Sequence, residues 1–284
     1  MAHTQQADRR SQHTSPTAAA PALVGYDGSE GGHDALVLAR ELSALRGTRC
    51  HVAVPGPGAA AEEARAALGD PEAPVEHIGF TSSGAVLANI AERDDVGTVV
   101  VGSSHHGKVG RALLGSVGEG VLRHAPCEVV IAPRGYAATA PHRLRRIAAA
   151  VNGTEESKVA LTRAEDLARQ AGAAVEVLVA DDPTVYAIQA EYPADAPAEL
   201  ANVLDAAVAS VDPRLSPTGR RIETGWRQVA RTIAAAIAAA CKPDDLLVTG
   251  CGRPIDHFLS GSVTRHLIAE APCAVLVVPH RRKV

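Results

Sequence analysis

Residues 99–117 read VVVGSSHHGKVGRALLGSV, and this stretch decides the fold. The β-branched run Thr98 to Val101, which begins one residue before this stretch, predicts a strand that ends at Gly102. A loop of glycine, serine and histidine follows, and Gly115-Ser116 opens a helical pattern. Backbone N–H groups at a helix start are unpaired and lie at the positive end of the helix dipole. The segment is therefore suited to holding a phosphate.

The second part of this stretch recurs near the C-terminus. Residues 114–133, LGSVGEGVLRHAPCEVVIAP, correspond to residues 260–279, SGSVTRHLIAEAPCAVLVVP. Gly115 and Gly261 stand 146 residues apart, and so do Ala125 and Ala271. Because the motifs G-S-V and A-P-C both recur at the same spacing of 146 residues, the sequence indicates an internal duplication.

Both halves alternate short apolar runs with segments of helical periodicity. The runs predict strands at 22–26, 50–54, 75–78, 98–101 and 128–132, and again at 146–151, 174–179, 246–249 and 274–278. Nearly continuous apolar strands between helices are typical of parallel sheets covered on both faces. The sequence therefore predicts an α/β protein of two tandem Rossmann-like or flavodoxin-like domains, each with a parallel five-stranded sheet.

The repeat also sets the predicted domain boundaries. Residues 1–20 are polar and aperiodic, which predicts a disordered tail. Domain 1 then spans 21–134, a linker 135–145 and domain 2 146–284, with an insertion at about 181–217. We expect the last strands, Glu128–Ala132 and Ala274–Val278, to pair and cover each other's edges. That pairing would make a pseudo-dimer within one chain. The sequence does not decide whether two whole chains also form a homodimer.

Composition excludes several classes of protein. The net charge is −4 without a long basic block, which argues against nucleic acid as a partner. No apolar run reaches the ~20 residues that cross a bilayer, and residues 1–20 lack the apolar centre of a signal peptide. We therefore expect no membrane partner and a cytoplasmic protein.

The five cysteines are an odd number without C-x-x-C, so a disulfide framework is not expected. Cys127 and Cys273 occupy equivalent repeat positions, where a small thiol packs well in a core. Cys251, flanked by glycines, is the thiol expected to be exposed. The pairs Asp94-Asp95 and Asp244-Asp245 are interpreted as solvated turns rather than catalytic carboxylates.

Several motifs together resemble the universal stress protein family, in tandem, over nearly the whole chain after residue 20. They are a strand ending at Asp27, the G-S-x-x-H-G segment from Gly102, then L-L-G-S-V and A-P-C. The resemblance implies the adenine nucleotide alpha hydrolase-like fold and a regulatory role in stress response. Members that bind ATP carry G-x-x-G, nine residues and G-S/T. Gly102 and Gly115-Ser116 match the outer spacing, and His105 stands at the inner glycine.

The same resemblance implies the site residues. Asp27 would lie near ribose and adenine, and Val52 would line the adenine pocket. The phosphates of ATP, with or without Mg²⁺, would be held by the loop and helix start, through Gly102, His105, Gly107, Gly115 and Ser116. His105 either closes this pocket with its β-carbon or donates a hydrogen bond to phosphate.

The second half departs further from the pattern. Asn152 replaces Asp27, and Gly250 precedes Gly261 by only 11 residues. We interpret domain 2 as degenerate, and whether it holds a ligand stays open.

Other functions fit less well. Gly102 to Lys108 reads G-x-x-x-x-G-K, but Val109 lacks the hydroxyl that a P-loop offers to Mg²⁺. His105-His106 lacks accompanying metal ligands, so no metal site is expected. No G-x-S-x-G, H-E-x-x-H or protein-kinase loop is present, which predicts a protein that is not an enzyme, with slow ATP hydrolysis left open. The leading hypothesis is ATP binding in domain 1 that modulates an unknown protein partner. The alternative is a nucleotide-free interaction module of the same fold.

Overall fold

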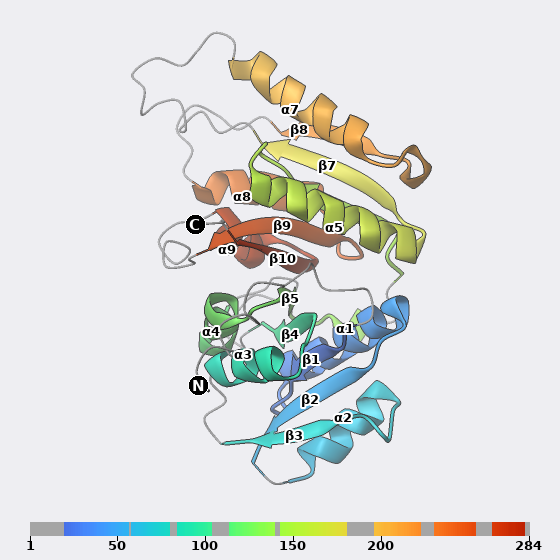
Figure 1. The fold of residues 1–284 in the computed structure, drawn as a ribbon, viewed down its shortest axis with the longest axis vertical. Helices are drawn as coiled ribbons and strands as arrows, with labels where there is room; N and C mark the ends of the chain where they lie inside the picture. Colours follow the sequence, from blue (N-terminus) through green and yellow to red (C-terminus); the bar gives the residue numbers. More distant parts are fainter. Residues whose placement is uncertain are drawn as a thin grey trace, which may run out of the picture.

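The computed structural model describes residues 20–56, 58–79, 84–103, 114–139, 143–180, 196–222, 230–253 and 263–281. The predicted tail therefore lies almost wholly outside the described residues. The first half runs β1 (Ala22–Gly25), α1 (Glu30–Arg46), β2 (Cys50–Pro55), α2 (Ala60–Leu68), β3 (Val75–Ile78), α3 (Gly84–Arg93), β4 (Thr98–Gly102), α4 (Ser116–His124) and β5 (Glu128–Ala132) (Figure 1).

A short 3-10 helix, η2 (Ala137–Thr139), leads into the second half. That half runs β6 (Arg146–Ala150), α5 (Glu155–Ala171), β7 (Ala174–Ala180), α7 (Ala196–Ser210), η3 (Pro213–Leu215), β8 (Thr218–Ile222), α8 (Ala230–Ala240), β9 (Leu246–Arg253), α9 (Val263–Glu270) and β10 (Ala274–Arg281). Helices α1 and α5 have the same length, and both end at a left-handed glycine, Gly47 and Gly172. Glycine takes this left-handed conformation readily because it has no Cβ, so it is a common residue at a helix end.

The strands form one ten-stranded sheet in the order β3-β2-β1-β4-β5-β10-β9-β6-β7-β8. Each half is parallel throughout and has the Rossmann-like strand order, which confirms the predicted fold class. Strands β5 and β10 pair antiparallel, with Val129 opposite Val277 and Ile131 opposite Val275. The expected pairing of the last strands is confirmed, and it joins the two sheets into one.

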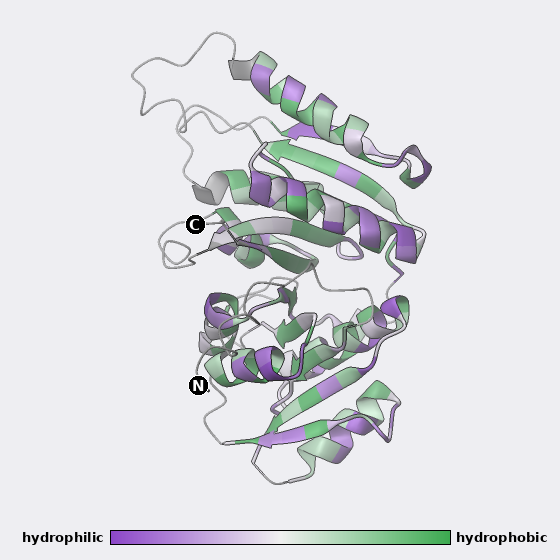
Figure 2. Ribbon diagram, in the orientation of Figure 1, coloured by the Kyte–Doolittle hydropathy of each residue, from purple (hydrophilic) through white to green (hydrophobic). Residues whose placement is uncertain are grey.

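Two apolar layers cover the sheet, and each runs through both halves. Helices α1, α2, α5 and α7 contribute to one layer. Helices α3, α4, α8 and α9 contribute to the other. Figure 2 shows largely hydrophobic strands between helices that carry hydrophilic residues. Aromatic residues make up only 2% of the chain, so the core consists mainly of alanine, valine, leucine and isoleucine.

The linker is attached to α1. The carboxylate of Asp34, 3% exposed, accepts hydrogen bonds from the backbone N–H groups of Gly135 and Ala137, both at 2.8 Å. The hydroxyl of Tyr136 donates to Glu41 Oε2 at 2.7 Å. Burial, and then this contact with Glu41, raise the pKa of Tyr136. The chain thus crosses between the halves along a fixed path on the first helix.

Part of the predicted insertion is folded. Residues 181–195 lie outside the described residues, and α7 packs on β7 and β8. Strand β8 was not predicted, because its sequence TGRRI is polar and exposed at the sheet edge.

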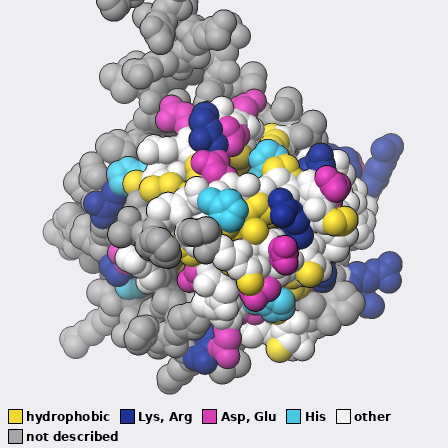
Figure 3. Space-filling view, turned by 90° about the horizontal axis from the view of Figure 1, so that it is seen from below, with side chains coloured by type: hydrophobic (Ala, Val, Ile, Leu, Met, Phe, Trp, Pro, Cys, Tyr) yellow, Lys and Arg dark blue, Asp and Glu magenta, His cyan; other side chains and the backbone are white. Residues whose placement is uncertain are grey.

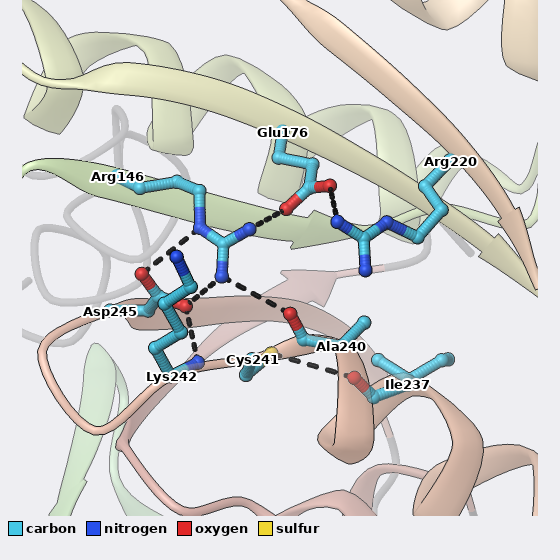
Figure 4. Close-up of polar contacts among 8 residues, drawn as sticks. All are labelled: Arg146, Glu176, Arg220, Ile237, Ala240, Cys241, Lys242 and Asp245. Atoms are coloured by element: carbon cyan, nitrogen blue, oxygen red, sulfur yellow. Dashed lines mark hydrogen bonds and ion pairs between the residues drawn. The ribbon is translucent and has the colours of Figure 1, made fainter.

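Two predictions about single residues are wrong. Cys251 is buried, since β9 continues past Gly250 and Cys251 lies opposite Pro279 of β10. Asp245 is 5% exposed rather than solvated. Arg146 Nε donates to Asp245 Oδ1 at 3.0 Å, and the Lys242 N–H donates to Oδ2 at 2.6 Å (Figure 4). Cys127 and Cys273 are buried as predicted.

The Asp245 contact belongs to a charged cluster at the amino ends of β6, β7 and β9 (Figure 4). Arg146 also pairs with Glu176 of β7, which accepts from Arg220 of the edge strand at 2.8 Å. The hydrogen bond to Asp245 raises the pKa of Arg146. Ion pairs among four side chains thereby link β6, β7, β8 and the loop before β9, through Arg146, Glu176, Arg220 and Asp245.

Candidate functional site

A cavity of about 90 Å³ lies at the carboxyl ends of β1, β2 and β4. In a doubly wound sheet this is the point where chain direction reverses and ligands bind. Its lining has an apolar part and a part rich in glycine, made by Gly25, Tyr26, Asp27, Ser29, Gly31, Gly32, Ala53, Pro55, Ile78, Leu87, Val101, Gly102 and Val117. The volume is below the ~300–1,000 Å³ of ordinary ligand pockets, so it can enclose only part of a nucleotide.

Asp27 lies in the turn between β1 and α1. Its Oδ1 accepts a hydrogen bond from the Ser29 N–H at 3.0 Å, and Gly28 provides the positive φ of 79° that the turn requires. Ser29 caps α1 by accepting from the Gly32 N–H at 3.0 Å. The Asp27 side chain is exposed and lies over the first helical turn, since a Cβ on Gly32 would stand 2.8 Å from its Oδ1. A carboxylate in this place is available to a ligand hydroxyl.

The end of β4 touches the first turn of α1. A Cβ on Gly102 would lie 1.8 Å from the carbonyl oxygen of Gly31, and a Cβ on Gly31 would lie 2.4 Å from that of Ser103. Both glycines are therefore required for packing. They also leave the floor of the cavity as bare backbone.

Helix α4 begins at the other side of the cavity. Gly115 is its N-cap and has no side chain to bond the first amides, while Val117 lines the cavity. Ser116 is exposed at this helix start. Unpaired N–H groups at a helix start favour an anion. The structure thus brings Asp27, Gly102, Gly115 and Ser116 to one edge of the sheet.

Three predicted positions differ from this group or cannot be compared with it. Val52 is 1% exposed in the layer beneath α1 and α2, and it does not line the cavity. Its neighbour Ala53 does, because successive strand residues face opposite sides. His105 and Gly107 lie outside the described residues.

Sequence reasoning missed much of the lining. Tyr26 follows β1, Ile78 ends β3 and Leu87 lies in α3, while Gly31 and Gly32 lie in the first turn of α1. Glycines in the first turn of a helix are unusual, and this was the signal available for them. The Tyr26 hydroxyl donates to Glu63 of α2 at 3.2 Å, and burial followed by this contact raises the pKa of Tyr26.

The second half has the same turn between its first strand and first helix, but a side chain fills the corner that corresponds to Gly31 and Gly102. Asn152 Oδ1 accepts from the Thr154 N–H at 3.3 Å, as Asp27 does from Ser29. At the place of Gly31 stands Glu156, whose Oε1 would be 2.9 Å from a Cβ on Gly252. A carboxylate therefore occupies the corner that is bare backbone in the first half.

Among the described residues there is no group of three or more His, Cys, Asp or Glu side chains that could hold a metal ion. None of the described helices is long and apolar enough to cross a membrane. On the face in Figure 3, described basic side chains are interspersed with acidic ones. The described side chains of that face form no basic stripe of the kind that nucleic acid requires.

Fold and site together define a class of protein: a tandem pair of doubly wound α/β domains with a glycine-lined crevice at the switch point of the first. Residues 54–133 and 143–279 match the Universal stress protein family. The chain belongs to this family, and the match in two segments agrees with the duplication.

Solved structures have the same fold along nearly the whole chain. A universal stress protein from Archaeoglobus fulgidus DSM 4304 is 16% identical, with a TM-score of 0.62, and the match covers 91% of this chain and 98% of that one. A putative universal stress protein from Pseudomonas aeruginosa UCBPP-PA14 is 18% identical, with a TM-score of 0.61, covering 92% and 93%.

Proposed function

We propose that the first half binds an adenine nucleotide, ATP in the first instance, and that occupancy modulates a protein partner during a stress response. The observation that carries the proposal is the contrast between the halves. The first-half crevice has glycines at its floor and two helix starts at its sides, whereas Glu156 stands at the matching corner of the second half.

The lining assigns parts of the ligand to parts of the crevice. The apolar residues Ala53, Pro55, Ile78 and Leu87 suit a base. The exposed Asp27 carboxylate suits a ribose hydroxyl. The phosphates would extend past Gly102 toward the α4 start at Ser116, where Mg²⁺ could accompany them.

Isothermal titration with ATP, ADP, AMP and cyclic AMP tests the proposal. We expect one site per chain, weakened at least about tenfold by D27N, which removes the charge but keeps the turn. Asn152 shows that asparagine makes this turn in the second half, and N152A is the matched control, expected to leave binding unchanged. No heat with any nucleotide, for protein shown to be folded, would contradict the proposal.

Two alternatives have their own tests. If H105G binds nucleotide and the natural protein does not, the natural protein is a nucleotide-free interaction module. Phosphate release from ATP that D27N abolishes would instead identify a slow ATPase.

A further inference from the structure

The two halves are related by an approximate two-fold axis that passes through their shared sheet. Val130 of β5 lies opposite Leu276 of β10, and these residues occupy the same place in the repeat, 146 residues apart. Val129 faces Val277 and Ile131 faces Val275, so the pairing is the same from either half. In such an interface, residues near the axis would face their own copies if two identical halves paired.

One charged pair near this axis breaks the symmetry. Glu119 of α4 and Arg265 of α9 are repeat equivalents, also 146 residues apart, and Arg265 donates to Glu119 Oε1 at 3.1 Å. Their side chains are 32% and 41% exposed. Pairing of two first halves would place glutamate against glutamate, and pairing of two second halves would place arginine against arginine.

A buried carboxylate breaks the symmetry more strongly. Glu128, 2% exposed, starts β5 and accepts from Arg163 of α5 at 3.0 Å. Its own half supplies Arg46 at 3.4 Å and the Thr98 hydroxyl at 3.2 Å. Burial lowers the pKa of Arg46 to about 10, and Glu128 opposes that shift.

Across the axis the equivalent positions are apolar. The repeat equivalent of Glu128 is Ala274, and that of Arg163 is Leu38, both 2% exposed. A pair of first halves would set each Glu128 against Leu38, and a pair of second halves would set each Arg163 against Ala274. Either arrangement removes a partner from a buried charge, which is strongly unfavourable.

We propose that the β5–β10 junction is a heterotypic interaction surface, which accepts the other half as its partner and rejects a second copy of the same half. The first half contributes the acidic residues Glu119 and Glu128, and the second contributes Arg163 and Arg265. Unpaired and like charges against the wrong partner are the usual means of such discrimination.

Hydrogen exchange of the β5 and β10 amides in the full-length chain tests the exposed pair. E119R and R265E recreate the like-charge contacts, and E119A and R265A are their neutral controls. We expect each reversal to speed exchange several-fold more than its alanine control, and E119R/R265E to return exchange to within about twofold of the natural chain. Reversals that match their alanine controls, or a double reversal no slower than the singles, would overturn the role of this pair.

The same measurement tests the buried pair. E128A should speed exchange at the junction about a hundredfold, because Arg163 and Arg46 then lack their carboxylate. Adding R163L should recover part of the protection, since the double variant reproduces the Leu38 and Ala274 combination while Arg46 still lacks its carboxylate. If E128A does not fold, R163L alone should give a smaller increase, because Arg46 and Thr98 still bind Glu128. Two results would overturn the proposal: faster exchange in E128A/R163L than in E128A, or junction exchange in R163L equal to that of the natural chain. The β1–β2 amides serve as the internal control.

Discussion

Gly102 and Gly31 touch backbone to backbone, because a Cβ on Gly102 would lie only 1.8 Å from the Gly31 carbonyl oxygen. The repeat has the same contact, where a Cβ on Gly250 would lie 2.2 Å from the Glu156 carbonyl oxygen. This glycine, which ends β4 and lies within β9, is thus required by packing in both halves, whether or not a ligand binds. Its presence in a sequence is therefore weak evidence for a phosphate site.

The first prediction concerns this contact. G102A should lower the free energy of unfolding by about 1–3 kcal/mol or more, because backbone atoms cannot give way as a flexible side chain does. G250A should behave alike. G58A is the control, since nothing lies within 4 Å of its added Cβ. Urea unfolding measures all three, and equal stability of G102A and G58A would contradict the packing argument.

The second prediction concerns the attachment of the linker to α1. D34A leaves the N–H groups of Gly135 and Ala137 without their acceptor, at a cost of about 2–4 kcal/mol for two hydrogen bonds to a buried charge. Trypsin should then cut faster after the exposed Arg143 and Arg145. Y136F, which removes the bond to Glu41 and leaves both bonds to Asp34 in place, should have a smaller effect on both measurements. Unchanged cleavage in D34A would show that other contacts hold the linker.

The third prediction separates the two acidic pairs that look alike in sequence. D245A should cost about 3 kcal/mol, because it takes a buried partner from Arg146. D94A removes an ion pair with the 58% exposed Arg93 and should change stability far less than D245A, because solvent screens an exposed pair. Chemical denaturation of both variants measures the difference, and similar values would contradict the distinction.

Local sequence predicted most of the fold because its strands are apolar and clearly bounded. Glu128–Ala132 is buried throughout and has the bounds that were expected, and so does Val75–Ile78 although it contains Glu76 and His77. Strand β8 was not predicted because an edge strand can contain polar residues such as Arg220 and Arg221 and needs no apolar run. Its place is fixed by pairing with β7, which local sequence does not show.

The site was harder to predict because it depends on contacts between distant residues. Asp27 and Gly102 follow strands and could be placed at the sheet edge by pattern alone. Ala53 lines the cavity in place of the predicted Val52, and this depends on which face of β2 packs against α1. The burial of Asp245 depends on Arg146, 99 residues away. Periodicity carries no information about either relation.

The last prediction is an alkaline loss of stability that involves Cys50. Burial raises the pKa of this thiol from its ordinary value of 9.0 to about 12. A thiol with a higher pKa in the folded chain contributes its full stabilisation below the unfolded pKa, and the contribution is lost as pH rises through the folded pKa. Stability should therefore fall between pH 9 and about 12, by at most about 4 kcal/mol from this group.

The variant C50A isolates this contribution from those of other groups. C50A also lowers the free energy of unfolding at neutral pH, because packing is lost. The comparison therefore uses the change in this free energy with pH, and not its absolute value. Tyr26 and Tyr136, whose pKa values are also raised, keep part of the slope above pH 10 in the variant. Urea unfolding at intervals from pH 7 to pH 11 should give a shallower fall for C50A than for the natural chain. Parallel curves would mean that Cys50 ionises as readily folded as unfolded, and hence that its surroundings admit water.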